Sequence, residues 1–444
     1  MTRFFRIRTA ATRSLLATFL GSVIAPQAAA QRSDTTVRTA GRPVHPGIAT
    51  LAEEVSIGVT TGADEYLFGQ IADVAIGRDG SMFVYDRQVP AVRRYDANGK
   101  YVRTFGRRGQ GPGEYRAVSG IAVLPDGRVL VWDTSGWRIN VYSPAGDLLT
   151  TWSTASGMST GAVSSSARAM LVDTSGTIWL RRRGALDRVR LASGPELYER
   201  RRSDGTVIDT IPRPPFPRGE LELTATDAAG RARHTSDLPF SAPLVWRASP
   251  LGYLVSGVPD RYAFELLIPA TAGSTSAPAR WRPGHPVISI RRAVDPTPVT
   301  RAERDSARNE VIASMRRLDP AWSWSGPEIP ANKPFYHDLA FGMDGRIWVP
   351  IIPEVTARLG SISGPGGGSI SGGAPAPPSR SPARAPPKPR PALYDVFEPN
   401  GAYIGQVQIP PRTTVAVRDG DRLWAVVTDE DDVQSLKRYR IVWR

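Results

Sequence analysis

The chain has 444 residues, no cysteine and a formal net charge of +14. The lack of thiols excludes a disulfide framework, a thioether lipid anchor and a thiolate metal site. A strong positive charge is typical of proteins that bind nucleic acid, but only four of the 56 basic residues are lysine. We attribute this preference for arginine to a G+C-rich genome, and we expect no nucleic-acid partner for a chain with an export signal.

The first thirty residues have the layout of a secretory signal peptide. Arginines precede an apolar run from Leu15 to Ala25, and small residues at 28–30 provide a cleavage site. This run is too short to span a bilayer, and no later stretch approaches the ~20 apolar residues that a spanning helix needs. The sequence therefore predicts a signal peptide at 1–30, export to the periplasm or outside the cell, and no membrane span.

The next segment has little regular patterning. Residues 31–50 contain Gly, Pro and Thr without periodicity, so we expect a loose N-terminal segment there. Residues 54–59 have the composition of one strand but no hairpin partner of their own.

One structural unit is written twice between Ile71 and Trp152. Each copy contains four short β-rich runs, and Asp-Gly, Asn-Gly or Ala-Gly pairs occupy the tight turns between them. Gly80 and Gly127 are 47 residues apart, and so are Gly99 and Gly146. A four-stranded antiparallel unit that repeats every 40–50 residues is typical of a β-propeller blade.

Two stretches carry a family resemblance. Residues 133–142 resemble the Asp-x-x-x-x-Arg-Ile-x-Val-Phe/Tyr core of NHL repeats, and residues 105–115 resemble the link that these repeats use between blades. In the first copy Ala91 replaces the arginine of the repeat. The chain is similar to bacterial exported six-bladed β-propeller proteins of the NHL and tolB-like group, most clearly over residues 66–152.

Degraded copies of the unit continue to the end of the chain. They cover about 169–211, 244–268, 337–409 and 414–442. Phe83, Trp179 and Trp348 each follow a turn glycine by three residues, where a large ring packs between neighbouring sheets. We therefore predict an all-β fold over residues 51–444, a six-bladed β-propeller of four-stranded antiparallel blades.

Two insertions interrupt the repeats. A capping-box pattern at Thr300 and Glu303, followed by apolar residues at helical spacing, predicts one inserted helix at about 299–318. We expect it to cover the core across the ring, with docking of a partner as the alternative. The Gly/Ser/Pro-rich stretch at about 359–392 cannot bury enough apolar surface to fold, and we expect a disordered loop.

The sixth unit lacks its last strand. Its third strand ends near Val442, and the chain stops at Arg444. An unpaired sheet edge there favours aggregation. We predict that residues 54–59, which precede the first blade, supply the missing outer strand and close the ring.

No pattern in the sequence defines a catalytic or metal site. The histidines at 45, 234, 285 and 337 never pair at metal-ligand spacing, and Gly157–Gly161 has the letters of a nucleophile elbow without its strand and helix. We therefore predict no catalytic residue, no metal and no cofactor. Because some six-bladed relatives are lyases, lactonases or amidating enzymes with a metal in the central channel, the resemblance leaves a lyase or hydrolase open as the alternative.

The leading functional hypothesis is a recognition scaffold that binds a ligand or protein partner at one face of the ring. Cations and an aromatic ring cluster in the loops around the second blade, and guanidinium groups suit anionic small molecules. We expect a monomer. The candidate ligand-binding residues are Arg107, Arg108, Trp137, Arg138, Asp86 and Asp133. For Asp133 and Arg138 the other interpretation is a hydrogen bond that stabilises the repeat.

Overall fold

The part of the chain that the computed structural model describes begins at Thr36 and ends at Arg444. The described residues are 36–154, 168–183, 196–214, 221–230, 233–267, 286–351 and 390–444. The predicted signal peptide at 1–30 lies outside them, as does all but the end of the predicted loop at 359–392. No helix among the described residues is long and apolar enough to cross a membrane.

The first three repeats form three four-stranded antiparallel sheets in chain order. The first contains β3 (Ile71–Ile76), β4 (Met82–Asp86), β5 (Ala91–Tyr95) and β6 (Tyr101–Phe105). The second contains β9 (Val118–Val123), β10 (Val129–Asp133), β11 (Arg138–Tyr142) and β12 (Leu148–Ser153). The third contains β13 (Met170–Val172), β14 (Ile178–Arg183), β15 (Glu196–Arg201) and β16 (Val207–Pro212). Their positions agree with the predicted repeats.

Three more sheets follow. The fourth contains β19 (Val245–Ala248), β20 (Leu254–Gly257), β21 (Ala263–Leu267) and β22 (Pro286–Arg292). The fifth contains β23 (Ala340–Phe341), β24 (Ile347–Ile351), β25 (Ala392–Phe397) and β26 (Tyr403–Ile409). The sixth contains β27 (Thr413–Asp419), β28 (Arg422–Thr428), β29 (Gln434–Val442) and, at its outer edge, β2 (Ile48–Ile57). The last strand of the fourth sheet, β22, was not predicted.

Glycine sets the hairpins of these sheets. Gly80 and Gly127 adopt φ angles of 78° and 86° at the turns between the first two strands of their sheets. Residues with a Cβ atom avoid this left-handed region, whereas a tight hairpin requires it. The repeated Asp-Gly pairs are therefore a direct sequence signal for the strand boundaries.

Each pair of consecutive sheets shares an apolar cluster. Phe83 packs in the cluster between the first and second sheets, Trp179 between the third and fourth, and Trp348 between the fifth and sixth. The remaining clusters join the second sheet to the third, the fourth to the fifth, and the sixth back to the first, where Trp424 lies with Val74. Because the sixth sheet packs on the first, the ring is closed and the chain is a six-bladed β-propeller.

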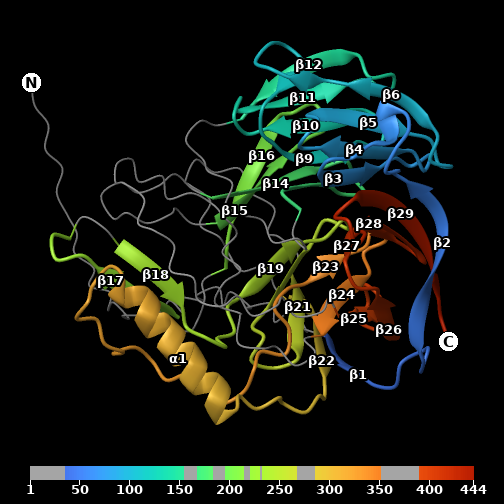
Figure 1. The fold of residues 1–444 in the computed structure, drawn as a ribbon. Coiled ribbons are helices and arrows are strands. Elements are labelled where there is room, and N and C mark those ends of the chain that lie inside the picture. Colours follow the sequence, from blue (N-terminus) through green and yellow to red (C-terminus); the bar gives the residue numbers. More distant parts are fainter. Residues whose placement is uncertain are drawn as a thin grey trace, which may run out of the picture. The chain divides into compact units, whose positions relative to one another are not determined.

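The strand that closes the ring is the one that the sequence predicted. β2 pairs antiparallel with β29, from Thr50 opposite Val442 to Ile57 opposite Leu436. Figure 1 shows this blue strand beside the red strand β29. The prediction of closure is confirmed, and the sixth blade gains its fourth strand from the N-terminal side of the chain.

The segment before β2 is more ordered than we predicted for residues 31–50. β1 (Thr36–Ala40) pairs in parallel with β22 at the edge of the fourth sheet. The N–H groups of Val44 and His45 then donate to the carbonyls of Tyr403 and Ile404, at 3.1 and 2.9 Å. The edges of the fourth and fifth sheets offer backbone groups that need partners, and this explains why a segment without periodicity is extended along them.

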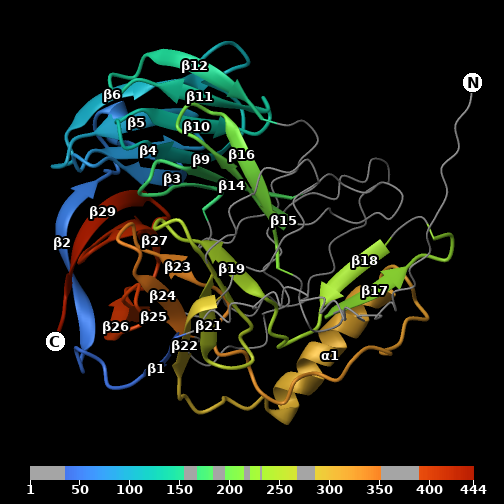
Figure 2. The same cartoon turned by 180° about the vertical axis from the view of Figure 1, so that it is seen from behind.

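The inserted helix covers a separate small core. α1 (Arg301–Arg316) begins with the predicted capping box at Thr300 and packs against an unpredicted hairpin, β17 (Glu222–Thr226) and β18 (Arg233–Asp237) (Figure 2). Its buried residues Ala307, Val311 and Met315 join a cluster with apolar side chains of this hairpin. The expectation that the helix covers the core across the ring was wrong, because its apolar face is buried by local partners.

Candidate functional site

The link between the first two blades is held in one conformation by its own backbone and two tyrosines. Its segments β7 (Arg107–Arg108) and β8 (Glu114–Tyr115) pair in parallel. Gly106 has a φ angle of 72°, and a Cβ atom there would lie 2.2 Å from the Tyr115 ring. The Tyr142 hydroxyl donates to the Gly113 carbonyl at 2.7 Å. Gly106 therefore allows close packing of the link on the buried Tyr115 ring.

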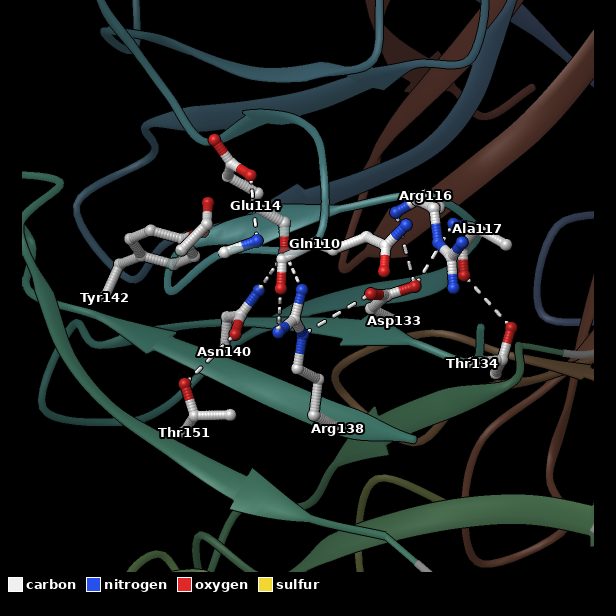
Figure 3. A network of polar contacts seen from close by, with 12 residues as sticks. Gln110, Glu114, Arg116, Ala117, Asp133, Thr134, Arg138, Asn140, Tyr142 and Thr151 are labelled. Atoms are coloured by element: carbon white, nitrogen blue, oxygen red, sulfur yellow. Dashed lines mark hydrogen bonds and ion pairs between the residues drawn. The ribbon is translucent and has the colours of Figure 1, made fainter. Parts of the chain in front are cut away.

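Asp133 and Arg138 connect the second blade to this link (Figure 3). Asp133 is 1% exposed and accepts the backbone N–H of Ala117 at 3.1 Å. The Arg138 guanidinium donates to the carbonyls of Gln110 and Glu114, at 3.0 and 2.6 Å, and its Nε lies 3.5 Å from the Asp133 carboxylate. Gly136 allows this approach, because a Cβ atom there would lie 2.5 Å from Asp133 Oδ2.

Asp86 occupies the matching place in the first blade. It is fully buried and accepts the backbone N–H groups of Gly69 and Gln70, at 2.8 and 3.0 Å. Ala91 stands opposite Asp86 in the sheet, where Arg138 stands opposite Asp133 in the second blade. The guanidinium of Arg93, two residues further along, comes within 3.8 Å of Asp86 instead. The first blade thus keeps the buried carboxylate, and Arg93 supplies the guanidinium group that Arg138 supplies in the second blade.

The geometry separates the predicted residues into two groups. Asp86, Asp133 and Arg138 make the hydrogen bonds that hold the links, as the structural interpretation of Asp133 and Arg138 anticipated. Arg107, Arg108 and Trp137 point their side chains toward solvent. We call these three residues the link face. Arg138, which follows Trp137, bonds to the Gln110 carbonyl of the link, so the three belong to one neighbourhood.

The link face contains two exposed cations and an exposed ring. The Arg107 side chain is 81% exposed and uses Nε to bind Glu114 at 2.8 Å. The Gly111 N–H and the Arg107 guanidinium lower the pKa of the Glu114 carboxyl below its usual value. Trp137 is 39% exposed and has a φ angle of 51°, and its carbonyl accepts the Thr154 N–H at 2.7 Å. Its backbone is therefore fixed while its ring stays accessible.

The three described histidines lie in separate parts of the fold. His45 stacks on Trp443 with ring centroids 4.9 Å apart, and His234 Nε2 lies 2.9 Å from the hydroxyl of Ser314 on α1. His337 precedes β23, and His285 lies outside the described residues. Within the part of the chain that the structure describes, no three His, Asp or Glu side chains form a group that could hold a metal ion.

We expect Asp133→Ala to destabilise the protein by about 1–3 kcal/mol, because the N–H groups of Arg116 and Ala117 lose their buried acceptor. Chemical denaturation of the variant and of Asp126→Ala measures the difference. Asp126 is a matched control because it pairs with Arg128 on the exposed turn of the same blade. Equal free energies of unfolding for the two variants would show that the Asp133 carboxylate does not stabilise the link.

Comparison with known proteins identifies the architecture. Residues 59–154 match the family model DUF5128, described as a 6-bladed beta-propeller. No curated protein matches the chain. A solved structure from Bacteroides fragilis is 10% identical, covers 92% of this chain and 99% of its own, and has a TM-score of 0.46. A DUF4221 member from Bacteroides vulgatus is 11% identical, covers 89% of this chain and 99% of its own, and has a TM-score of 0.48.

Virginiamycin B lyase from Staphylococcus aureus is a third solved structure similar to this chain. It is 9% identical, with coverage of 87% of this chain and 98% of its own and a TM-score of 0.36. At such identities the activities of these proteins say nothing about the activity of this chain. The family match at 59–154 and the six antiparallel blades together identify the fold as a six-bladed β-propeller.

Proposed function

We propose that this chain is an exported recognition scaffold that binds an anionic ligand, or an acidic patch of a protein partner, at the link face. The observation that carries the proposal is the exposure of Arg107, Arg108 and Trp137 on two segments that the Arg138–Gln110 hydrogen bond joins. The Arg108 guanidinium has no hydrogen-bond or ion-pair partner among the described residues. Arg107 uses only its Nε–H, which donates to Glu114. Both keep donors for a carboxylate or phosphate group.

The surroundings of the pair favour recognition. The Asp133–Arg138 contacts hold the link that carries both arginines, so little conformational freedom is lost when a ligand binds. The exposed indole of Trp137 adds contact area for an organic ligand at low entropic cost. Export follows from the arginines, apolar run and small residues of the first thirty positions.

The test is a double substitution, Arg107→Gln with Arg108→Gln. Binding of a fluorescent hexaglutamate peptide and of inorganic polyphosphate is measured by anisotropy at about 0.15 M salt, where diffuse charge attraction is largely screened. We expect a loss of affinity of roughly tenfold or more, since each charged hydrogen bond contributes about 1.5–3 kcal/mol. The melting temperature stays near that of the parent protein, because both side chains are exposed.

The matched control removes the same charge elsewhere. Arg301→Gln with Arg308→Gln on α1 deletes two cations remote from the link, and Arg301 is 96% exposed. An equal loss of affinity in both double variants would show that binding depends on net charge alone. An unchanged affinity in the Arg107/Arg108 variant would refute the placement of the ligand site at the link face. Stoichiometric zinc or calcium in the purified protein would favour the alternative, a lyase or hydrolase with a metal in the channel.

A further inference from the structure

A second group of cations lies where the first strands of the sheets meet. The first strands β3, β9 and β13 contact each other in turn, and β27 contacts β3, so these strands surround the centre of the ring. A pocket opens between β13, β19, β23 and β27, three of which lie together near the centre of Figure 1. We call it the channel pocket. Arg168, Arg247 and Arg418 line it together with apolar side chains, among them Leu171, Leu339, Phe341, Val415 and Val417.

Two of the three arginines have a carboxylate partner. Arg168 lies 3.2 Å from Asp73, and Arg247 forms an ion pair with Asp338. Arg418 has no carboxylate partner among the described residues, although it is only 6% exposed. The three positive charges thus have two carboxylate partners between them. The charge without an ion pair lies on the most buried of the three arginines, where the Asp338 carboxylate, already paired with Arg247, acts only from a distance.

The lack of an ion pair distinguishes Arg418 from the other arginines that lie over aromatic rings. The guanidinium of Arg418 is 5.3 Å from the centre of the Trp348 ring and 5.6 Å from that of Tyr394. Five further arginines in the described part of the chain lie over a ring, and each of them also has a carboxylate partner: Arg93, Arg94, Arg200, Arg292 and Arg308. In this chain a ring does not by itself replace the counter-ion.

Each of the three arginines also keeps one hydrogen-bond donor without a partner. The Nε atoms of Arg168, Arg247 and Arg418 are all buried and have no hydrogen-bond partner. A buried guanidinium without an anion has a substantial desolvation cost that a nearby ring offsets only in part. Burial is the main cause that lowers the pKa of Arg418 below its ordinary value. A site with these properties is complete only when an anion enters it.

We propose that the channel pocket binds a small ligand through its carboxylate or phosphate oxyanion, with Arg418 as the principal cation and Arg168 and Arg247 beside it. Guanidinium groups match both oxyanions in geometry. Leu339, Phe341 and Val415 provide an apolar wall for the rest of an organic ligand. The channel pocket and the link face share no residue, so either proposal can fail without the other.

The test uses the full-length protein, dialysed free of phosphate and carboxylate buffers. Melting temperature and calorimetric heat are recorded with sodium phosphate, acetate or benzoate, against sodium chloride at equal ionic strength. We expect a saturable rise in melting temperature, since a ligand that binds only the folded state stabilises it. A response to phosphate alone assigns a phosphate group as the anionic group of the natural ligand. Tighter binding of benzoate than of acetate assigns a carboxylic acid with an apolar substituent.

The decisive variant is Arg418→Met. We expect its affinity for the responding anion to fall at least about tenfold, while the ligand-free protein melts at or above the parental temperature because an unpaired buried charge has been replaced by an apolar chain. Arg94→Met is the matched control, since Arg94 also lies over a ring but pairs with Asp79 away from the pocket. It keeps the full response.

Two results would overturn the channel site. One is the absence of any stabilisation by the three anions beyond that of chloride. The other is an Arg418→Met protein that responds to anions as the parent does. If Arg418→Met does not fold, Arg168→Gln gives the same comparison, because the Arg168 side chain is 27% exposed and its loss leaves no cavity in the sheet clusters.

Discussion

Deletion of residues 51–60 is expected to unfold the whole ring in a single transition at a much lower temperature. These residues carry most of β2, the outer strand of the sixth blade. Ile57 is 1% exposed in the cluster that joins the sixth sheet to the first. Glu54 binds Arg438 at 3.0 Å and Arg422 at 3.1 Å, and Glu53 binds Lys437 at 2.8 Å. The deletion therefore exposes β29 as an edge and opens the ring.

Circular dichroism and calorimetry measure this effect. Because each blade is stabilised mainly by its neighbours, loss of one strand is transmitted to all six sheets, and the shift exceeds that of any point substitution discussed above. The control is deletion of residues 361–385 in the Gly/Ser/Pro-rich stretch, which we expect to leave the melting temperature almost unchanged. If the protein without residues 51–60 had the melting temperature of the parent protein, the closure of the ring by β2 would be contradicted.

Asp395→Ala is expected to destabilise the protein by about 3–5 kcal/mol, the usual effect of removing one partner of a buried charge pair. Asp395 on the fifth sheet is fully buried and accepts the hydroxyls of Tyr262 and Tyr403, at 2.6 and 2.7 Å. It also forms an ion pair with Arg292 of the fourth sheet. The substitution leaves this guanidinium and two hydroxyls without their acceptor at the contact between two blades.

The effect of Asp395→Ala should persist at alkaline pH. Burial, followed by the Asp395 charge, raises the pKa of Tyr262 and of Tyr403 above the usual tyrosine value. Both hydroxyls therefore keep their protons at pH 10 and continue to donate to Asp395. Urea denaturation at pH 7 and at pH 10 measures the loss, and Asp305→Ala is the control. Asp305 forms a solvent-exposed pair with Arg301, so its removal is expected to change the free energy by less than about 1 kcal/mol.

An Asp395→Ala protein as stable as the Asp305→Ala protein would show that the polar cluster does not hold the fourth and fifth blades together. Asp395→Asn adds a finer comparison. It keeps an oxygen that accepts one hydroxyl and loses only the charge that faces Arg292, so we expect a smaller loss of stability than for alanine.

Most of the blade strands could be predicted from local sequence signals. Glycines with positive φ, such as Gly80 and Gly127, bound strands whose side chains alternate, and both signals are local. The capping box at Thr300 predicted the start of α1 for the same reason. Even the closing strand was predictable, because the sixth repeat visibly lacked a strand and the first was preceded by an extra one. In each case the residues that carry the signal are close in the chain, or their number is fixed by the repeat.

The roles of the polar residues depend on contacts between segments that are distant in the chain. Asp133 and Asp86 were candidates for ligand binding, yet their carboxylates face backbone N–H groups of the links, which no spacing in the chain reveals. The arginines of the channel pocket were not among the predicted site residues. Arg247 follows Arg168 by 79 residues and Arg418 follows Arg247 by 171, so the three meet only when the ring closes. Charge balance depends on distances between side chains of different blades, so the fold had to be known before the unpaired charge could be seen.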